Sequence, residues 1–226
     1  MKNLTIEFSS FKRLLQNCPD IKVMDCKSQF DPPSESRKRS GMSELREAGF
    51  DVEDWLGQII TLTKGNSISY HVIRNRQGRG EGSFHLIDPQ EFLLESEPWV
   101  AKQGATPEDR SLLAKVRVID QPSVAQTFTA VVVGSGSPPK LPNSLVYCRR
   151  GRVVPLSIGF KDYYEHLAVF MGILNWQLLF SEASPSDAIF QADFEQLKEN
   201  WEDFKAMFPS KDFGQWEKKL GEKGLN

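Results

Sequence analysis

The residue types that most often carry catalysis or bind metal ions are few and widely spaced in this chain. Its 226 residues include three histidines and three cysteines, with no HExxH motif and no CxxC pair. Such sites usually rely on ligands close together on a helix turn or loop, so we expect no metal and no cofactor. Ser135 lies between two glycines, but Val133 stands where a nucleophile elbow requires glycine. The chain is therefore predicted not to be an enzyme. A small cytosolic hydrolase, whose catalytic groups meet only in the folded chain, stays open as an alternative.

Two glycine clusters are candidates for holding a phosphate. The first, Gly78 to Gly82, leads into a predicted strand, and the second, Gly134 to Gly136, is followed by two prolines. A dinucleotide site needs a helix that begins directly after the glycines and points its amides at the phosphate. Both clusters are therefore interpreted as turns.

The stretch from Trp55 to Gly80 contains basic residues and no acidic one. Its basic residues are Lys64, Arg74, Arg76 and Arg79. Tyr70 is the one aromatic residue between them, so the pattern matches poorly with proteins that stack single-stranded bases. We interpret the stretch as a solvated hairpin with an arginine loop. Arg74, Arg76 and Arg79 are expected to be exposed and to contact an acidic partner or a phosphate.

The clearest periodic signal is an aromatic stripe near the C-terminus. Large apolar residues recur there at intervals of three and four, at Phe190, Phe194, Leu197, Trp201, Phe204 and Phe208. This spacing predicts an amphipathic helix that ends at Pro209. The stripe must pack on the body of the protein, on a second copy or on a partner. In the last case, Phe194, Trp201 and Phe204 are the residues expected to contact the partner.

The amino-acid composition indicates a folded protein with a hydrophobic core and limits the class of protein. Hydrophobic residues make up 39% and charged residues 26%, with a net charge of -2. This near-neutral balance argues against a dedicated nucleic-acid-binding domain. No apolar stretch reaches the length of a membrane span, and no secretory signal is recognised. We expect a cytoplasmic protein with free thiols and no membrane contact.

Four regions are predicted along the chain. Residues 1–27 form an N-terminal helical segment, and the Pro/Ser/charge-rich residues 28–42 form a linker. Residues 43–182 form an α+β domain, and residues 183–226 a C-terminal helical extension. The domain is expected to hold a single, mostly antiparallel sheet flanked by helices.

Changes in apolar period mark the expected elements. Helices are predicted over 8–15, 43–55, from 90 onward, 160–171 and 190–208, and strands over 59–63, 67–73, 83–87, 116–119, 127–133 and 153–156. Residues 127–133 are apolar enough for a central strand. Tyr164, Leu167, Trp176 and Phe180 are expected to be buried, because no charged residue occurs from 166 to 181.

Three consecutive segments carry a family resemblance. They are the apolar stretch Val153 to Leu156, the Phe-x-x-x-Tyr-x-x-Leu helix from Phe160 to Leu167, and the Gly-Ile-x-x-Trp-Gln-x-Leu-Phe stretch from Gly172 to Phe180. Together they resemble the C-terminal end of SUKH-superfamily domains, which include the fungal Smi/Knr cell-wall regulators and bacterial toxin-immunity proteins. The resemblance implies an α+β fold with one sheet flanked by helices, no cofactor, no catalytic residues and function through protein binding.

We therefore predict a non-enzymatic protein-protein interaction module, whose partner would be a toxin or a regulatory target. The alternative is a protein that binds nucleic acid or a phosphate ligand through the loop from Arg74 to Arg79. Salt dependence separates the two, because phosphate binding weakens steeply as salt rises and an apolar contact does not.

Overall fold

The structure is a computed structural model. It describes residues 4–27, 35–50, 56–57, 59–60, 66–72, 81–89, 105–122, 127–133 and 144–225. These residues form an α+β fold with antiparallel strands and a helical C-terminal region, which confirms the predicted fold class.

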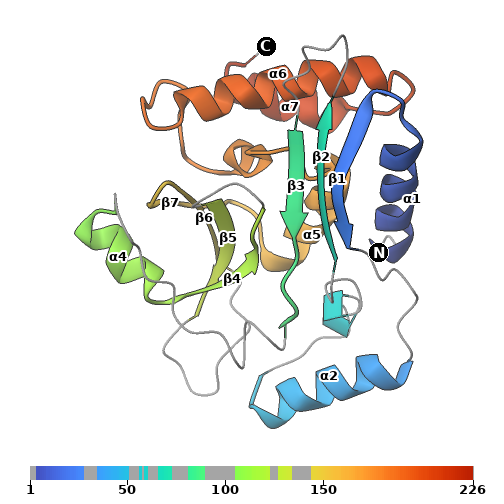
Figure 1. The fold of residues 1–226 in the computed structure, drawn as a ribbon. Coiled ribbons are helices and arrows are strands. Elements are labelled where there is room, and N and C mark those ends of the chain that lie inside the picture. The colour runs from blue at the N-terminus through green and yellow to red at the C-terminus, as the bar shows by residue number, and fades with distance from the viewer. Residues whose placement is uncertain are drawn as a thin grey trace.

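The elements follow one another along the chain in the order that Figure 1 labels. They are α1 (Leu4–Asn17), β1 (Ile21–Lys27), α2 (Glu35–Glu47), β2 (Ser67–Val72), β3 (Glu81–His85), α4 (Pro107–Leu113), β4 (Val116–Asp120), β5 (Thr127–Val132), β6 (Leu145–Arg149), β7 (Arg152–Pro155), α5 (Phe160–Phe170), η3 (Trp176–Phe180), α6 (Gln191–Met207) and α7 (Gly214–Glu222).

The strands divide into two antiparallel sheets where the sequence predicted one. Strands β1, β2 and β3 form a three-stranded sheet, and β4 to β7 form a four-stranded sheet in chain order. A single bridge between Leu86 and Asp120 joins the end of β3 to the edge of β4. The other half of β3 is bridged at Gly82 to Ile173, which follows α5. The free side of β3 thus has two different neighbours along its length. For this reason β3 and β4 do not pair as regular neighbouring strands, and the two sheets stay separate.

In the view of Figure 1, α5 lies behind the three-stranded sheet and α1 lies beside β1. The ring of Phe84 on β3 lies 5.6 Å from Phe8 and 6.3 Å from Phe11, both on α1. Tyr70 on β2 donates a hydrogen bond of 2.7 Å to the carbonyl of Met171. Its ring passes over Gly82, where an added Cβ would lie 2.1 Å from it, so only glycine fits at this position. The inner face of this sheet is therefore core.

The four-stranded sheet is covered on both faces. On one face, Phe128, Ala130 and Val146 form an apolar cluster with Leu113 of α4. The residues next to them in each strand, such as Thr129 and Tyr147, face α5, η3 and α6, where they meet buried polar partners. Strand β5 lies between β4 and β6, which confirms the central strand predicted for 127–133.

Aromatic rings join the C-terminal helices to this body. Phe170 stacks on Trp176 with ring centroids 5.2 Å apart, and its ring lies 4.1 Å from that of Trp216 on α7. Trp216 in turn stacks on Trp201 of α6 at 4.8 Å. The four residues predicted to be buried are all in the core: Tyr164, Leu167, Trp176 and Phe180.

The N-terminal regions differ from the sequence prediction. Residues 1–27 are not only helical, because β1 pairs with β2 and belongs to the sheet. Helix α2 begins at Glu35, inside the residues predicted as a linker, and ends at Glu47 before the predicted end at Trp55. Its charged residues made the segment look like a linker, yet Met42 and Leu45 on one side of the helix are buried.

Further elements were missed or mistaken. Ile59 and Ile60, predicted as the first strand of a hairpin, are helical and buried, because a short apolar run suits either structure. Helix α4, strand β6, the 3-10 helix η3 and helix α7 were not predicted. The predicted helix from residue 90 lies outside the described residues.

Candidate functional site

The aromatic stripe on α6 is not a free docking face. Phe194, Trp201 and Phe204 are 1%, 3% and 0% exposed and belong to the main core. Phe204 contacts Tyr70 of β2 at 5.8 Å between ring centroids. The structure therefore corrects the expectation that these three side chains contact a partner, because packing on the body removes them from the surface.

The three arginines of the predicted loop fall in residues 73–80, outside the described residues. The segment joins β2 to β3, whose ends are paired at His71 and Glu81. The exposure predicted for Arg74, Arg76 and Arg79 stays a prediction.

The three-stranded sheet has one polar face opposite its core face. The residues on it are Lys22, Asp25, Ser67, Ser69, His71, Glu81, Ser83 and His85, which we call the polar sheet face. Lys22, His71 and Glu81 lie in one row across the strands, and Asp25, Ser69 and Ser83 lie in the next. No described helix covers this face, which is turned toward the viewer in Figure 1.

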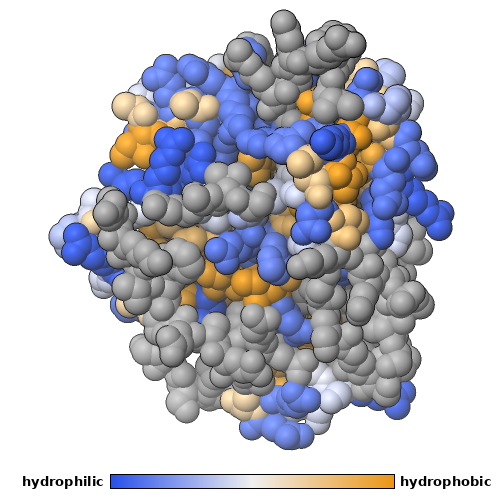
Figure 2. Space-filling view, viewed as in Figure 1, coloured by the Kyte–Doolittle hydropathy of each residue, from blue (hydrophilic) through white to orange (hydrophobic). Residues whose placement is uncertain are grey.

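Charged side chains surround a serine centre on the polar sheet face. Lys22, Asp25 and His85 are exposed, and the side chain of His71 is 52% exposed. Ser69 in the middle is short and half-buried, so the centre of the face lies lower than its charged margin. Figure 2 shows hydrophilic areas interleaved with smaller apolar ones on this side of the molecule.

Glu81 connects the polar sheet face to α6. Asn200 of α6 accepts a 3.2 Å hydrogen bond from the Glu81 backbone N–H, and its amide donates a 3.4 Å bond to the Glu81 carbonyl. Gln196 donates a 2.8 Å bond to the Glu81 carboxylate, and His71 lies 3.8 Å from its other oxygen. Asn200 is fully buried, so its hydrogen bonds connect the start of β3 firmly to α6.

A buried ion pair joins β6 to α6 in the interior. The guanidinium of Arg149 donates to one carboxylate oxygen of Asp193 from Nε at 3.1 Å and from Nη2 at 2.8 Å. Its Nη1 donates to Thr127 at 2.7 Å. Burial by itself lowers the pKa of Arg149, but the hydrogen bonds and charge of Asp193 outweigh it and the pKa is raised. Nε, Nη1 and Nη2 of Arg149 all donate hydrogen bonds within the protein. We therefore interpret the pair as structural rather than as part of a binding site.

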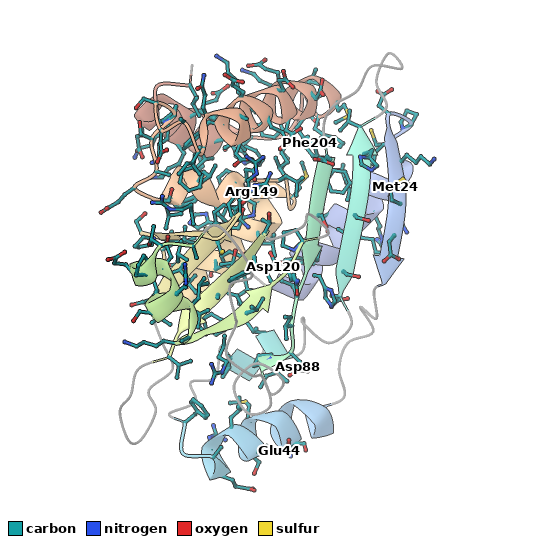
Figure 3. The ribbon with its side chains drawn as sticks, turned by 60° about the vertical axis from the view of Figure 1, so that its left-hand side comes forward. Met24, Glu44, Asp88, Asp120, Arg149 and Phe204 are labelled. Atoms are coloured by element: carbon teal, nitrogen blue, oxygen red, sulfur yellow. The ribbon has the colours of Figure 1, made fainter. Side chains whose placement is uncertain are left out.

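Asp120 forms a second buried polar group, near the junction of the two sheets. It accepts hydrogen bonds from Tyr163 Oη at 2.6 Å and from the backbone N–H of His85 at 2.8 Å. Burial raises the pKa of Asp120 from 3.8 to about 7, although both hydrogen bonds act in the opposite direction. The oxygen of Tyr163 also contacts Thr129 at 3.1 Å and Gln177 at 3.2 Å. Figure 3 places both Asp120 and Arg149 inside the fold, away from the surface.

A surface groove of about 400 Å³ lies where α6 turns into α7. Its charged groups are engaged with one another or with the backbone. Lys205 lies 2.6 Å from Glu217, Lys211 donates to the carbonyl of Val169 at 3.3 Å, and Asp212 caps the backbone of Gly214 at 2.9 Å. The groove therefore offers a ligand few uncommitted groups.

The histidines and cysteines lie apart from one another. His71 and His85 are on the polar sheet face, whereas His166 is half-buried on α5 with its ring 4.4 Å from that of Phe180. Burial lowers the pKa of His166. Cys148 is buried in β6, and burial raises the pKa of its thiol to about 11. In the described part of the chain, no three His, Cys, Asp or Glu side chains converge as metal ligands would. None of the helices described there has the length and apolar character needed to cross a membrane.

Comparisons with protein-family models, curated proteins and solved structures found no match to this chain.

The sequence did contain a signal for the polar sheet face. In β2, Ser67, Ser69 and His71 alternate with Ile68, Tyr70 and Val72. An alternation of this kind predicts a strand with one face in the core and one in solvent. The whole face could not be assigned in the same way, because β1 was taken for part of a helical segment and β3 was predicted as a strand only from Ser83 onward.

Proposed function

We propose that the chain is a non-enzymatic protein-interaction module that binds its partner on the polar sheet face. The observation that carries the proposal is a sheet face that no described helix or strand covers, backed by core, with charged side chains of both signs around a low serine centre. Backbone hydrogen bonds between the strands keep these residues in fixed rows. The entropy lost when a partner binds is therefore small, because the backbone of the site is already ordered. This proposal agrees with the function that the resemblance to SUKH domains implies.

The mixture of charges favours a protein over a polyanion. A nucleic acid approaching Lys22 on this face would also meet the carboxylates of Asp25 and Glu81. Repulsion from these two groups offsets the attraction of the lysine. A protein surface can instead match both signs, which gives specificity as well as a faster encounter.

Site-specific crosslinking tests the proposal. A photo-crosslinking amino acid is placed at Ser69, in the middle of the polar sheet face, or at Glu202, an exposed residue on α6. In cells that naturally express the protein, we expect a discrete protein adduct from Ser69 and none from Glu202. Adding His71→Ala and His85→Ala to the Ser69 protein should reduce the adduct, since both side chains border the same surface.

Nuclease and salt separate this proposal from the nucleic-acid alternative. A protein adduct that survives nuclease and high salt supports the interaction module. Adducts that vanish on nuclease treatment would favour binding to nucleic acid, whose affinity falls steeply with salt. Equal labelling from Ser69 and Glu202 would rule out the polar sheet face as the binding site.

A further inference from the structure

The polar sheet face ends at β1, the outer strand of the three-stranded sheet. Within the residues that the structure describes, β2 is the one strand paired with β1, so its other edge has no strand beside it. Figure 3 shows β1 at the outer margin of the sheet with no described helix or strand beyond it. Phe8 and Phe11 pack α1 against Phe84 on the inner face of the sheet. Such an edge offers backbone donors and acceptors to a further strand.

The charges along β1 are complementary to themselves. From Asp20 to Lys27 the sequence reads Asp-Ile-Lys-Val-Met-Asp-Cys-Lys, and reading it backwards exchanges every acid with a base. When two copies run antiparallel with Val23 opposite Met24, Lys22 of each copy stands opposite Asp25 of the other. Opposite charges directly across a strand pair stabilise it.

A bulge in β1 makes this arrangement possible. In a regular strand, residues three apart such as Lys22 and Asp25 point to opposite faces. The pairing of β1 with β2 shifts between Val23 and Asp25, which leaves Met24 as the extra residue. This shift reverses the alternation and places Lys22 and Asp25 on the same face of the sheet. In a two-fold pair with Val23 opposite Met24, the bulges of both copies lie at the two-fold axis. Lys22 of one copy and Asp25 of the other therefore lie on the same face of the joined sheet.

Met24 is the most exposed large apolar side chain in the described part of the chain. It is 53% exposed, and the one other exposed side chain of this kind, Leu14, is 38% exposed. In the antiparallel pair, Met24 of each copy lies beside the axis, opposite Val23 of the other. Pairing therefore covers Met24, an apolar side chain that is otherwise exposed to water.

We propose that two copies of this chain pair through β1 and join their sheets, with three strands from each copy, into one of six strands. The contact is isologous, as most contacts in soluble dimers are. The charged residues and the bulge of β1 discourage pairing with an arbitrary strand. A second copy of β1 carries complementary charges and a bulge at the same place, so it can pair. This inference goes beyond the proposed function. Lys22 and Asp25 belong to both surfaces, but the two tests have different readouts, because sedimentation of the purified chain measures self-association and crosslinking in cells reports a different protein.

Two charge reversals test the pairing in the full chain. Lys22→Glu and Asp25→Lys each replace both attractive contacts with repulsive ones. By sedimentation over a concentration series, we expect a dimer for the wild type and a dissociation constant about tenfold weaker for each variant. Mixing the two variants should restore the dimer, because the introduced glutamate of one chain then faces the introduced lysine of the other. Lys218→Glu on α7 makes the same change in net charge as Lys22→Glu and should leave the dimer unchanged.

The mixture distinguishes pairing from misfolding, since two damaged chains would not repair one another. A wild-type chain that sediments as a monomer throughout the series overturns the proposal. The same holds for single variants that dimerise as well as the wild type, or for a mixture that stays monomeric.

Discussion

Arg149 on β6 donates two hydrogen bonds to a single carboxylate oxygen of Asp193 on α6, and both side chains are buried. The pair joins the four-stranded sheet to helix α6 in the interior of the protein. Removing one partner of such a pair leaves a charge without compensation in the interior.

Asp193→Ala should therefore lower the free energy of unfolding by about 3–5 kcal/mol, because it strands the Arg149 guanidinium. Urea denaturation followed by circular dichroism measures the change. The control is Glu195→Ala, an exposed acidic residue on the same helix, which should change stability by less than about 0.5 kcal/mol. Similar losses for both variants would show that the ion pair adds nothing specific.

Trp176→Ala should cost about 3–5 kcal/mol, as deletion of a large buried side chain does. Trp176 is 1% exposed and contacts Phe170 and Tyr163 at 5.2 and 5.1 Å between ring centroids, so a cavity forms between η3 and α5. Chemical denaturation of the purified variant gives the value. A loss below about 1 kcal/mol would mean that the segment around η3 is not core.

Asp120 predicts a dependence of stability on pH. Burial raises its pKa from 3.8 in an unfolded chain to about 7, so between these pH values the folded protein holds a proton that the unfolded chain has lost. Its contribution to stability is therefore complete below about pH 4 and is lost as the pH rises toward 7. Asp120→Asn cannot titrate at this position. Between pH 4 and pH 7 the free energy of unfolding of the variant should therefore fall less steeply with pH than that of the wild type, and the two slopes should differ by up to about 1 kcal/mol per pH unit.

Tyr163→Phe gives the opposite signature to Asp120→Asn. The Tyr163 hydroxyl favours the ionised form of Asp120, so its removal should extend the loss of stability to higher pH. Denaturant midpoints measured from pH 4 to pH 8 compare the two variants with the wild type. Parallel curves for all three proteins would exclude Asp120 as the titrating group.

Deletion of residues 187–226 should leave a chain that aggregates. The segment contains α6 and α7, and without them Tyr70 and Phe170 would lose the rings of Phe204 and Trp216 that cover them. An apolar surface of this extent does not stay in water on a monomer. The fraction of protein in the supernatant after expression, compared with the full chain, tests this. An equally soluble and equally stable truncated chain would make the C-terminal helices an appendage.

The sequence by itself determined the features that depend on local periodicity. The α+β class, the helices over 160–170 and 191–207, and the central strand at 127–132 follow from the period and length of their apolar runs. Burial of Trp176 and Phe180 follows from the absence of charge around them. These features need no knowledge of distant residues, because an apolar face has to be covered whatever covers it.

Only the tertiary structure decided what covers each face and which strands are neighbours. The aromatic stripe of α6 suited a partner as well as the body, and contacts such as Phe204 with Tyr70, far apart in sequence, put it in the core. The polar sheet face likewise needs three strands, of which β1 reads in sequence as a charged tail of a helical segment. Its bulge at Met24 depends on the register with β2, so no local pattern could reveal that Lys22 and Asp25 share a face.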